Sequence, residues 1–208
     1  VDSPLHYRSA DNLPAIARRA KAGLCTYLMS NALTPTAATK TLTFQTKYRQ
    51  EFITITPQVE AFIAESGVQT GTITIQSHHT TASIWVNEDE KNLIGPKEKL
   101  GYINDLSRVL DRFADPEEEY GHNDVRDVNN PKGKRDTHLC EPDICGVVHE
   151  CINGHAHAQG MILPCSVTMI IENGKLVKGH WQQIMLVELD HDRERKVTLM
   201  AQGVGKQA

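Results

Sequence analysis

SVTMIIENGKLV, residues 166–177, is the stretch that decides the fold. β-branched and other apolar residues dominate its first half, and they favour extended strands. Asn173-Gly174 then separates two apolar runs. Both central residues of a type I′ hairpin turn need a positive φ angle, which Asn and Gly adopt most readily. The segment therefore predicts an antiparallel β-hairpin.

Segments on both sides of this hairpin have the apolar patterning of strands. They are residues 42–46, 52–55, 72–76, 82–86, 184–189 and 196–200. Two helices interrupt them. One is predicted to begin at Thr56, as the cap, and Pro57, and to end before Gly67, while the other carries an apolar stripe over residues 102–113. Strands with a few inserted helices predict the α+β class with a mostly antiparallel sheet.

The first 36 residues are expected to be a helical extension and linker. Apolar residues recur at helical spacing over residues 13–29, with basic residues among them, and a linker-like stretch follows. Such a helix can pack on its own domain, on a neighbouring subunit or on a membrane surface. The main domain is expected over residues 37–208, with a charged, irregular insertion around residues 125–151.

The composition is typical of a globular protein. Of 208 residues, 39% are hydrophobic and 23% are charged, and the formal net charge of −4 argues against general nucleic-acid binding. No run approaches the roughly 20 apolar residues of a membrane-spanning helix. Five cysteines, an odd number, do not indicate a small secreted disulfide framework. We therefore expect reduced thiols, no membrane partner and a soluble, cytoplasmic protein.

Polar groups crowd the start of the predicted strand 82–86, in the stretch SHHTTASIWVNE, residues 77–88. Further histidines lie outside the predicted strands at His122 and at His155 and His157. Histidine is the usual zinc ligand and the usual proton carrier near neutral pH. Exposed loop histidines would show the same spacing, because only the fold could bring these residues together.

Two other groups have alternative interpretations. Thiols and imidazoles mix over residues 138–151, and they are either a structural zinc site or reduced cysteines, since no CxxC pair is present. Trp181 either packs on the core or lines a site. Arg193 and Arg195 either clamp an anionic group or form a solvated pair beside Asp192 and Glu194.

Taken in order, five blocks resemble the YjbQ-like family, many of whose members are labelled secondary thiamine-phosphate synthase. The blocks are HTTASIWVNE (79–88), YGHND (120–124), NGHAH (153–157), S-x-T-x-I-x5-L-x2-G-x-W-Q-x-I (166–184) and E-x4-R-x-R (188–195). The resemblance runs from about residue 40 to residue 203. It implies an α+β fold built on a β-sandwich, assembly as a homotrimer, and a cleft near the subunit contacts.

The resemblance also implies a site. His79, His122 and His157 match the family's recurrent histidines, and we expect them to converge as catalytic groups and as ligands of a divalent metal, zinc in particular. Glu88 would orient an imidazole or accept a proton. The hydroxyls that would contact substrate are those of Thr80, Thr81 and Ser83.

Family members are linked to joining hydroxymethylpyrimidine diphosphate to thiazole phosphate, in which departure of diphosphate leaves a carbocation. Mg²⁺ or the side chains of Arg193 and Arg195 would stabilise the diphosphate, and Trp181, with Gln182 beside it, would line the cation. The resemblance therefore implies an enzyme that acts on a small phosphorylated metabolite, with thiamine-phosphate synthesis as the named activity.

The chain departs from the family pattern in two blocks. His180 replaces the Thr of Gly-Thr-Trp-Gln, and Asp190-His191-Asp192-Arg193 stands where Asp-Gly-Pro-Arg is common. Two other functions stay open. The protein could be a trimer that holds a metal or a phosphorylated metabolite without catalysis, or a structural protein whose histidines pin the trimer.

Overall fold

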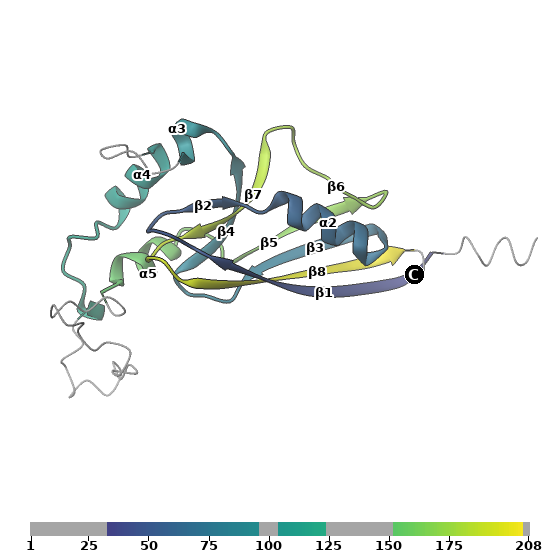
Figure 1. The fold of residues 1–208 in the computed structure, drawn as a ribbon, viewed down its shortest axis with the longest axis horizontal. Helices are drawn as coiled ribbons and strands as arrows, with labels where there is room; N and C mark the ends of the chain where they lie inside the picture. The colour runs from purple at the N-terminus through teal and green to yellow at the C-terminus, as the bar shows by residue number, and fades with distance from the viewer. Residues whose placement is uncertain (1–32, 96–103, 124–151, 206–208) are drawn as a thin grey trace, which may run out of the picture.

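Two antiparallel β-sheets pack against each other (Figure 1). The computed structural model describes residues 33–95, 104–123 and 152–205. The larger sheet has the strand order β1-β8-β3-β5-β6 and the smaller sheet the order β2-β7-β4. The strands are β1 (Thr34–Gln45), β2 (Phe52–Thr54), β3 (Val68–Ser77), β4 (Ala82–Glu88), β5 (Ser166–Glu172), β6 (Lys175–Leu176), β7 (Gln182–Glu188) and β8 (Glu194–Gly205). The predicted α+β class with antiparallel sheets is confirmed.

The β5–β6 hairpin forms where the sequence predicts it. Ile171 pairs with Leu176, and Glu172 pairs with Lys175. Asn173 and Gly174 have φ angles of 53° and 70°. Both central residues are therefore left-handed, as a type I′ hairpin turn requires.

Strand β1 begins earlier than the sequence suggests. Thr34 pairs with Gly205, and Thr36 pairs with Gly203, so residues assigned to the linker already belong to the sheet. Pro35 indicated a linker, but β1 is an edge strand, where the missing N–H of proline is tolerated. Residues 34–36 of the predicted linker therefore belong to β1.

The main core lies between the two sheets and helix α2 (Thr56–Ser66). Ile73 and Leu199 from the larger sheet belong to one buried cluster with Ile84 and Ile184 from the smaller sheet. Thr56, which we expected to cap α2, is instead its first residue. Its Oγ1 accepts a hydrogen bond from the backbone N–H of Ile184 at 2.8 Å, which ties the helix to β7.

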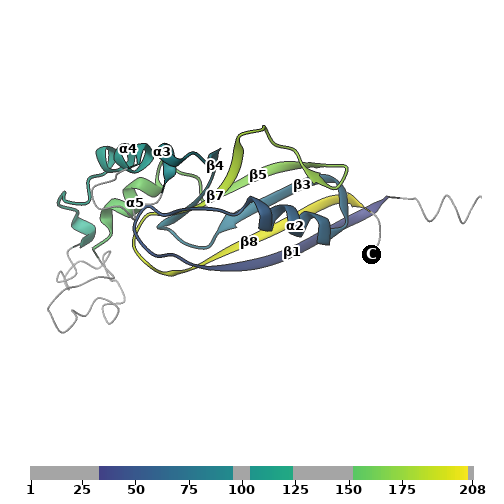
Figure 2. The same ribbon diagram turned by 45° about the horizontal axis from the view of Figure 1, so that its top comes forward.

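Three short helices gather at the end of the sandwich that lies away from the C-terminal end of β8 (Figure 2). They are α3 (Lys91–Ile94), α4 (Asp105–Phe113) and α5 (Gly154–Gly160). A second apolar cluster joins them to the smaller sheet, through Met185, Val187, Leu189, Ile94, Leu110 and Ala156. The sequence predicted α4, whose side-chain cap is Asn104, but neither α3 nor α5.

The predicted helix at residues 13–29 and the predicted insertion at residues 125–151 lie outside the described residues. Over the ranges that the structure does describe, no helix has both the length and the apolar character needed to cross a membrane. The candidate site described below is built from strand ends and from the short helices at one end of the sandwich.

Candidate active site

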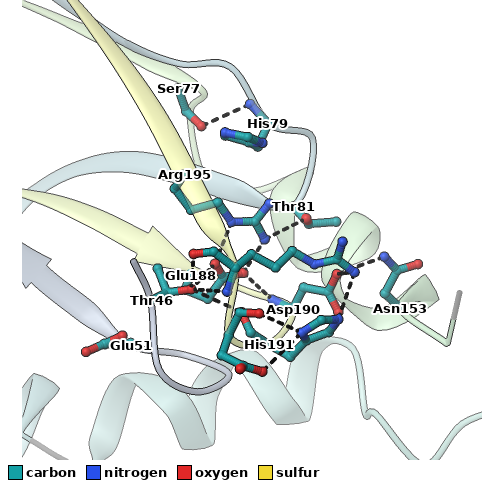
Figure 3. Close-up of polar contacts among 12 residues, drawn as sticks. Thr46, Glu51, Ser77, His79, Thr81, Asn153, Glu188, Asp190, His191 and Arg195 are labelled. Carbon is teal, nitrogen blue, oxygen red and sulfur yellow. Dashed lines mark hydrogen bonds and ion pairs between the residues drawn. The ribbon is translucent and has the colours of Figure 1, made fainter. Parts of the chain in front are cut away.

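A buried ion pair is the centre of a polar network near helix α5 (Figure 3). Glu188 is the last residue of β7, and Arg195 is the second residue of β8. Arg195 Nε donates to Glu188 Oε2 at 2.5 Å, and Arg195 Nη2 donates to Oε1. This two-point contact offsets much of the free-energy cost of removing both charges from water.

Three neighbours add further hydrogen bonds to the ion pair. Thr46 Oγ1 donates to Glu188 Oε2 at 3.0 Å, and the backbone N–H of Asp190 donates to Oε1 at 2.9 Å. Arg195 Nη2 also donates to Thr81 Oγ1 at 3.1 Å. Because these side chains are buried, the network fixes the end of β1, the start of β4 and the β7–β8 turn in one arrangement.

Asp190 extends the network to helix α5. Its buried carboxylate accepts from Arg193 Nη2 at 2.9 Å and from Asn153 Nδ2 at 3.0 Å. Arg193 Nη2 also contacts His191 Nε2 at 2.8 Å. Since Asn153 is the residue immediately before α5, the network reaches the helix that carries His155 and His157.

His79 lies near Arg195, at the turn between β3 and β4 (Figure 3). Its Nε2 accepts a hydrogen bond from the backbone N–H of Lys196 at 2.8 Å. A neutral imidazole that accepts at one nitrogen carries its proton on the other, which here is Nδ1. Partial burial, and then the positive charge of Arg195, lower the pKa of His79 below its ordinary value and favour the neutral ring.

His122 and His157 lie edge to face, with their ring centroids 4.5 Å apart. His122 belongs to the short 3₁₀ helix η2 (Gly121–Asn123) and is exposed, whereas His157 on α5 is partly buried. Asn123 Oδ1 accepts the backbone N–H of Gly154 at 2.9 Å, which holds η2 against α5. The fold thus brings together two of the three histidines that we expected to converge.

His155, also on α5, is more buried than His157, because only 6% of its surface is exposed. Neither of its ring nitrogens has a hydrogen-bond partner within the described residues. Burial, and then the charge of Arg49, lower the pKa of His155, while Asp190 and Asp111 act in the opposite direction. A buried neutral imidazole with unpaired nitrogens beside a charged network is a candidate functional group.

Several of the predicted site residues share this end of the molecule. Arg193, Arg195 and Thr81 contact the network directly, and His79 lies within electrostatic reach of Arg195. Thr80 is exposed beside Thr81. Ser83 is buried in β4 opposite Val187.

Glu88, Trp181 and Gln182 lie elsewhere. In the β4–β7 register, Glu88 pairs with Gln182, whereas Glu188 pairs with Ala82. Six residues of strand separate these two pairs, or roughly 20 Å at the usual rise per residue. The prediction that these three residues line one site with His79 is therefore wrong within a single chain. Strand patterning had indicated the strand, but not which of its ends carries the site.

Two further interpretations are corrected by the structure. Trp181 does not pack on the core, because 67% of its surface is exposed and its ring lies edge to face against His180 at 4.5 Å. Arg193 and Arg195 are not a solvated pair, since each contacts a buried carboxylate. The flanking acids at positions 192 and 194 are exposed, and the acids at positions 188 and 190 are the partners.

Sequence reasoning assigned no role to four residues of the network, Thr46, Asn153, Glu188 and Asp190, and it named the nearby His155 only among the histidines outside the predicted strands. The available signal was the E-x4-R-x-R block. It lies where one predicted strand ends and the next begins, a position at which an acid and a base can face each other across the turn. Thr46 had no comparable signal, because its contact depends on how β1 meets that turn.

Within the described ranges, no three His, Cys, Asp or Glu side chains are arranged as a metal-binding group. His122 and His157 are adjacent, but the Nε2 atom of His79 is engaged by β8. The thiols and imidazoles of residues 138–151 lie outside the described residues. The three-histidine metal site therefore stays a prediction.

This fold and this network define an α+β protein with a histidine-rich polar site at one end of a β-sandwich. A family model described as UPF0047 protein YjbQ-like matches residues 40–204, and the chain belongs to that family. The UPF0047 protein YugU of Bacillus subtilis is 31% identical over 164 residues, which are 79% of this chain and 98% of that protein. A UPF0047 protein of Methanocaldococcus jannaschii is 32% identical over 152 residues, which are 73% of this chain and 85% of that protein.

Solved structures show the same fold. A YbjQ-like protein of unknown function from Sulfolobus solfataricus P2 matches with a TM-score of 0.64 and 27% identity, over 82% of this chain and 99% of that chain. A hypothetical protein from Aeropyrum pernix K1 matches with a TM-score of 0.61 and 26% identity, over 80% of this chain and 98% of that chain. The family and fold predicted from the five blocks are confirmed.

Proposed function

We propose that the protein is an enzyme that acts on a small phosphorylated metabolite at the helical end of the sandwich. The observation that carries this proposal is the buried network of Glu188, Arg195 and Asp190 beside several histidines. Stability alone rarely accounts for a buried ion pair, because apolar residues of similar volume often stabilise a protein equally well or better. Buried ionisable groups and shifted pKa values are typical of active sites.

The candidate reaction follows from the family resemblance. In thiamine-phosphate synthesis, the bond between carbon and the diphosphate oxygen breaks, and the thiazole nitrogen forms a new bond to that carbon. We assign phosphate binding to His79, Arg193 and Arg195, with the exposed hydroxyl of Thr80 at the edge of the site. We assign proton transfer to the solvent-accessible pair His122 and His157, because imidazole is suited to that task near neutral pH.

A divalent metal is part of the proposal only at His122 and His157. Two imidazoles are fewer than the three protein ligands of a typical catalytic zinc site, so the residues that the structure describes do not complete one. We therefore assign no step to zinc. Mg²⁺ would accompany a diphosphate substrate as its counter-ion, which requires no cluster of protein ligands.

A homotrimer and a cytoplasmic location belong to the same proposal. Large apolar side chains are exposed at several positions, among them Trp181, Met161 and Ile170. Exposed apolar surface is typical of protein contacts when it is contiguous. An assembly would cover such side chains.

The test measures thiamine-phosphate formation by histidine variants and compares His79 with its neighbour in the sequence, His78. The His79→Ala and His157→Ala variants should lower thiamine-phosphate formation at least about a hundredfold, the usual range for a lost acid, base or binding group. His78→Ala is the matched control, because His78 is exposed and contacts Thr198 Oγ1 at 2.7 Å on the outer face of the larger sheet. Equal activity in the His78 and His79 variants would contradict the proposal. Elemental analysis of the same samples would test for zinc.

One observation favours a second function, a binding protein without catalysis. Both arginines are already paired with carboxylates, Arg195 with Glu188 and Arg193 with Asp190. Little net positive charge therefore remains to stabilise a diphosphate as it leaves the substrate carbon. A phosphorylated ligand that raises the melting temperature and is recovered unchanged, as measured by ³¹P NMR, would support binding alone. Formation of a new phosphorus species would exclude it.

A further inference from the structure

The orientation of His79 conflicts with a role as a metal ligand. Metal bound at Nε2 would displace the hydrogen bond from the Lys196 N–H. Metal bound at Nδ1 would require the proton to move to Nε2, and that proton would then face the N–H of Lys196. Either mode of ligation leaves a backbone donor of β8 without its acceptor, which is costly in free energy.

Arg195 has one donor group left over. Nε and Nη2 both contact Glu188, and Nη2 also contacts Thr81. Within the described residues, no hydrogen bond engages Nη1, although only 4% of the side chain's surface is exposed. In a planar guanidinium that uses Nε and Nη2 for a side-on contact, Nη1 lies on the side away from the carboxylate.

We propose that His79 Nδ1–H and Arg195 Nη1–H form an oxyanion subsite for a phosphate oxygen of the ligand. This inference rests on the proposed function, because it names the groups that would bind the phosphorylated substrate. His79 acts in it as a neutral hydrogen-bond donor, not as a base or as a metal ligand. The lowered pKa of His79 agrees with a neutral ring.

The chemistry of the two groups selects the ligand. Both are donors and neither is an acceptor, so they match an oxygen that offers lone pairs. Arg195 carries a positive charge, which strengthens a hydrogen bond to an anionic oxygen. Because Glu188 balances that charge, the subsite suits one phosphate oxygen and not a whole diphosphate.

The position of the proton on His79 can be measured without any ligand. Long-range ¹H–¹⁵N correlation spectra of the ¹⁵N-labelled full chain at pH 7.5 distinguish the two neutral tautomers. We expect His79 to carry its proton on Nδ1. A proton on Nε2, or a charged ring at this pH, would overturn the inference and leave the proposed function intact.

Two substitutions test the two ring nitrogens of His79 one at a time, and phosphate binding is the quantity measured. His79→Asn keeps a donor near the position of Nδ1, whereas His79→Gln keeps an acceptor near Nε2 for Lys196 and loses the donor. With inorganic phosphate as the probe, we expect His79→Gln to bind roughly tenfold more weakly, the effect of one lost hydrogen bond to a charged group. His79→Asn should stay within about threefold of the wild type.

The opposite order of these affinities would overturn the subsite. Phosphate binding that neither variant changes would place the phosphate elsewhere and would leave the proposed function standing. No phosphate binding in wild-type protein with the expected tautomer would contradict the subsite and the phosphorylated substrate together.

Discussion

The negative charge of Glu188 stabilises the network, because it balances the positive charge of the buried Arg195. Glu188→Gln keeps the shape of the side chain and removes its charge. We expect it to lower the free energy of unfolding by about 3–5 kcal/mol, since the arginine is left buried without a counter-charge. Urea denaturation of wild type and variant would measure this difference.

Glu194→Gln is the matched control. Glu194 is exposed, and its contact with Lys196 Nζ is long, at 3.6 Å. A surface ion pair of this kind contributes less than about 1 kcal/mol. Equal losses in the two variants would show that burial of the Glu188 charge has no special consequence.

His155 should make stability depend on pH. Its folded-state pKa is lowered by burial first and by Arg49 second, against the opposing charges of Asp190 and Asp111. Below pH 6.5 the unfolded chain binds a proton that the folded chain resists, so stability is complete above the unfolded pKa and falls as pH drops through it. Melting temperatures at pH 7.5 and pH 5, measured with EDTA present, would show a larger loss for wild type than for His155→Gln.

His180→Gln serves as the comparison for that experiment, because His180 is exposed near the opposite end of β7. It should follow the wild type at both pH values. Identical pH dependence of the wild type and the His155→Gln variant would mean that His155 is accessible to protons in the folded protein.

At the scale of elements, one carboxylate of helix α4 ties the helix to the loop before β2. Asp111 accepts from Arg49 Nη1 at 2.5 Å and from Gln50 Nε2 at 2.6 Å. Gln50 is buried and has a φ angle of 58°, an unfavourable value for a residue with a side chain, so these contacts help to hold the loop before β2. Asp111→Asn should speed hydrogen exchange of the α4 amides roughly tenfold, because it weakens hydrogen bonds to a charged group.

Asp105→Asn provides the matched comparison on the same helix. Asp105 is exposed, and its partner Arg108 is exposed as well. Exchange in the middle of α4 should therefore change little. Equal acceleration in both variants would show that the Arg49–Asp111 contact does not anchor the helix.

The elements differ in how well the sequence predicted them. Asn173-Gly174 carries its own conformational preference, so the β5–β6 hairpin could be found locally. Helix α5 has glycine at both ends and no helical signal of its own. Gln159 ties it to α4, because its Nε2 donates to the backbone oxygens of Leu110 and of Ala114, the residue that follows α4. Contacts between distant segments, which no local pattern reveals, stabilise this helix.

The same limit applies to the candidate site. The blocks predicted which residue types matter, and the structure places His79, Thr81 and Arg195 at one end of the molecule. They could not show that Glu188 and not Glu88 is the carboxylate beside them, because both glutamates end strands that pair with each other. Only the register distinguishes the two ends.

At the scale of the whole molecule, the separation of Trp181 from His79 has a consequence for assembly. In a cyclic trimer, each subunit contacts the next through a different patch of its surface, so opposite ends of the chain can meet at every interface. The proposed trimer would then place Trp181 of one chain near His79 of its neighbour. Trp181 is exposed and aromatic, as residues that anchor interfaces usually are.

Mixed trimers test this arrangement. His79→Ala and Trp181→Ala chains should each lack turnover when they are assayed alone. Refolding them together in equal amounts should restore activity at about a quarter of the sites, because that share combines an intact His79 with an intact Trp181 from the neighbouring chain. Light scattering would verify that each variant still forms trimers, and His78→Ala mixed with wild type would control for refolding losses. Activity that stays absent in a mixture of intact trimers would mean that the two residues do not serve one shared site. Trp181 would then act only where the structure places it, roughly 20 Å along the sheet from the buried ion pair.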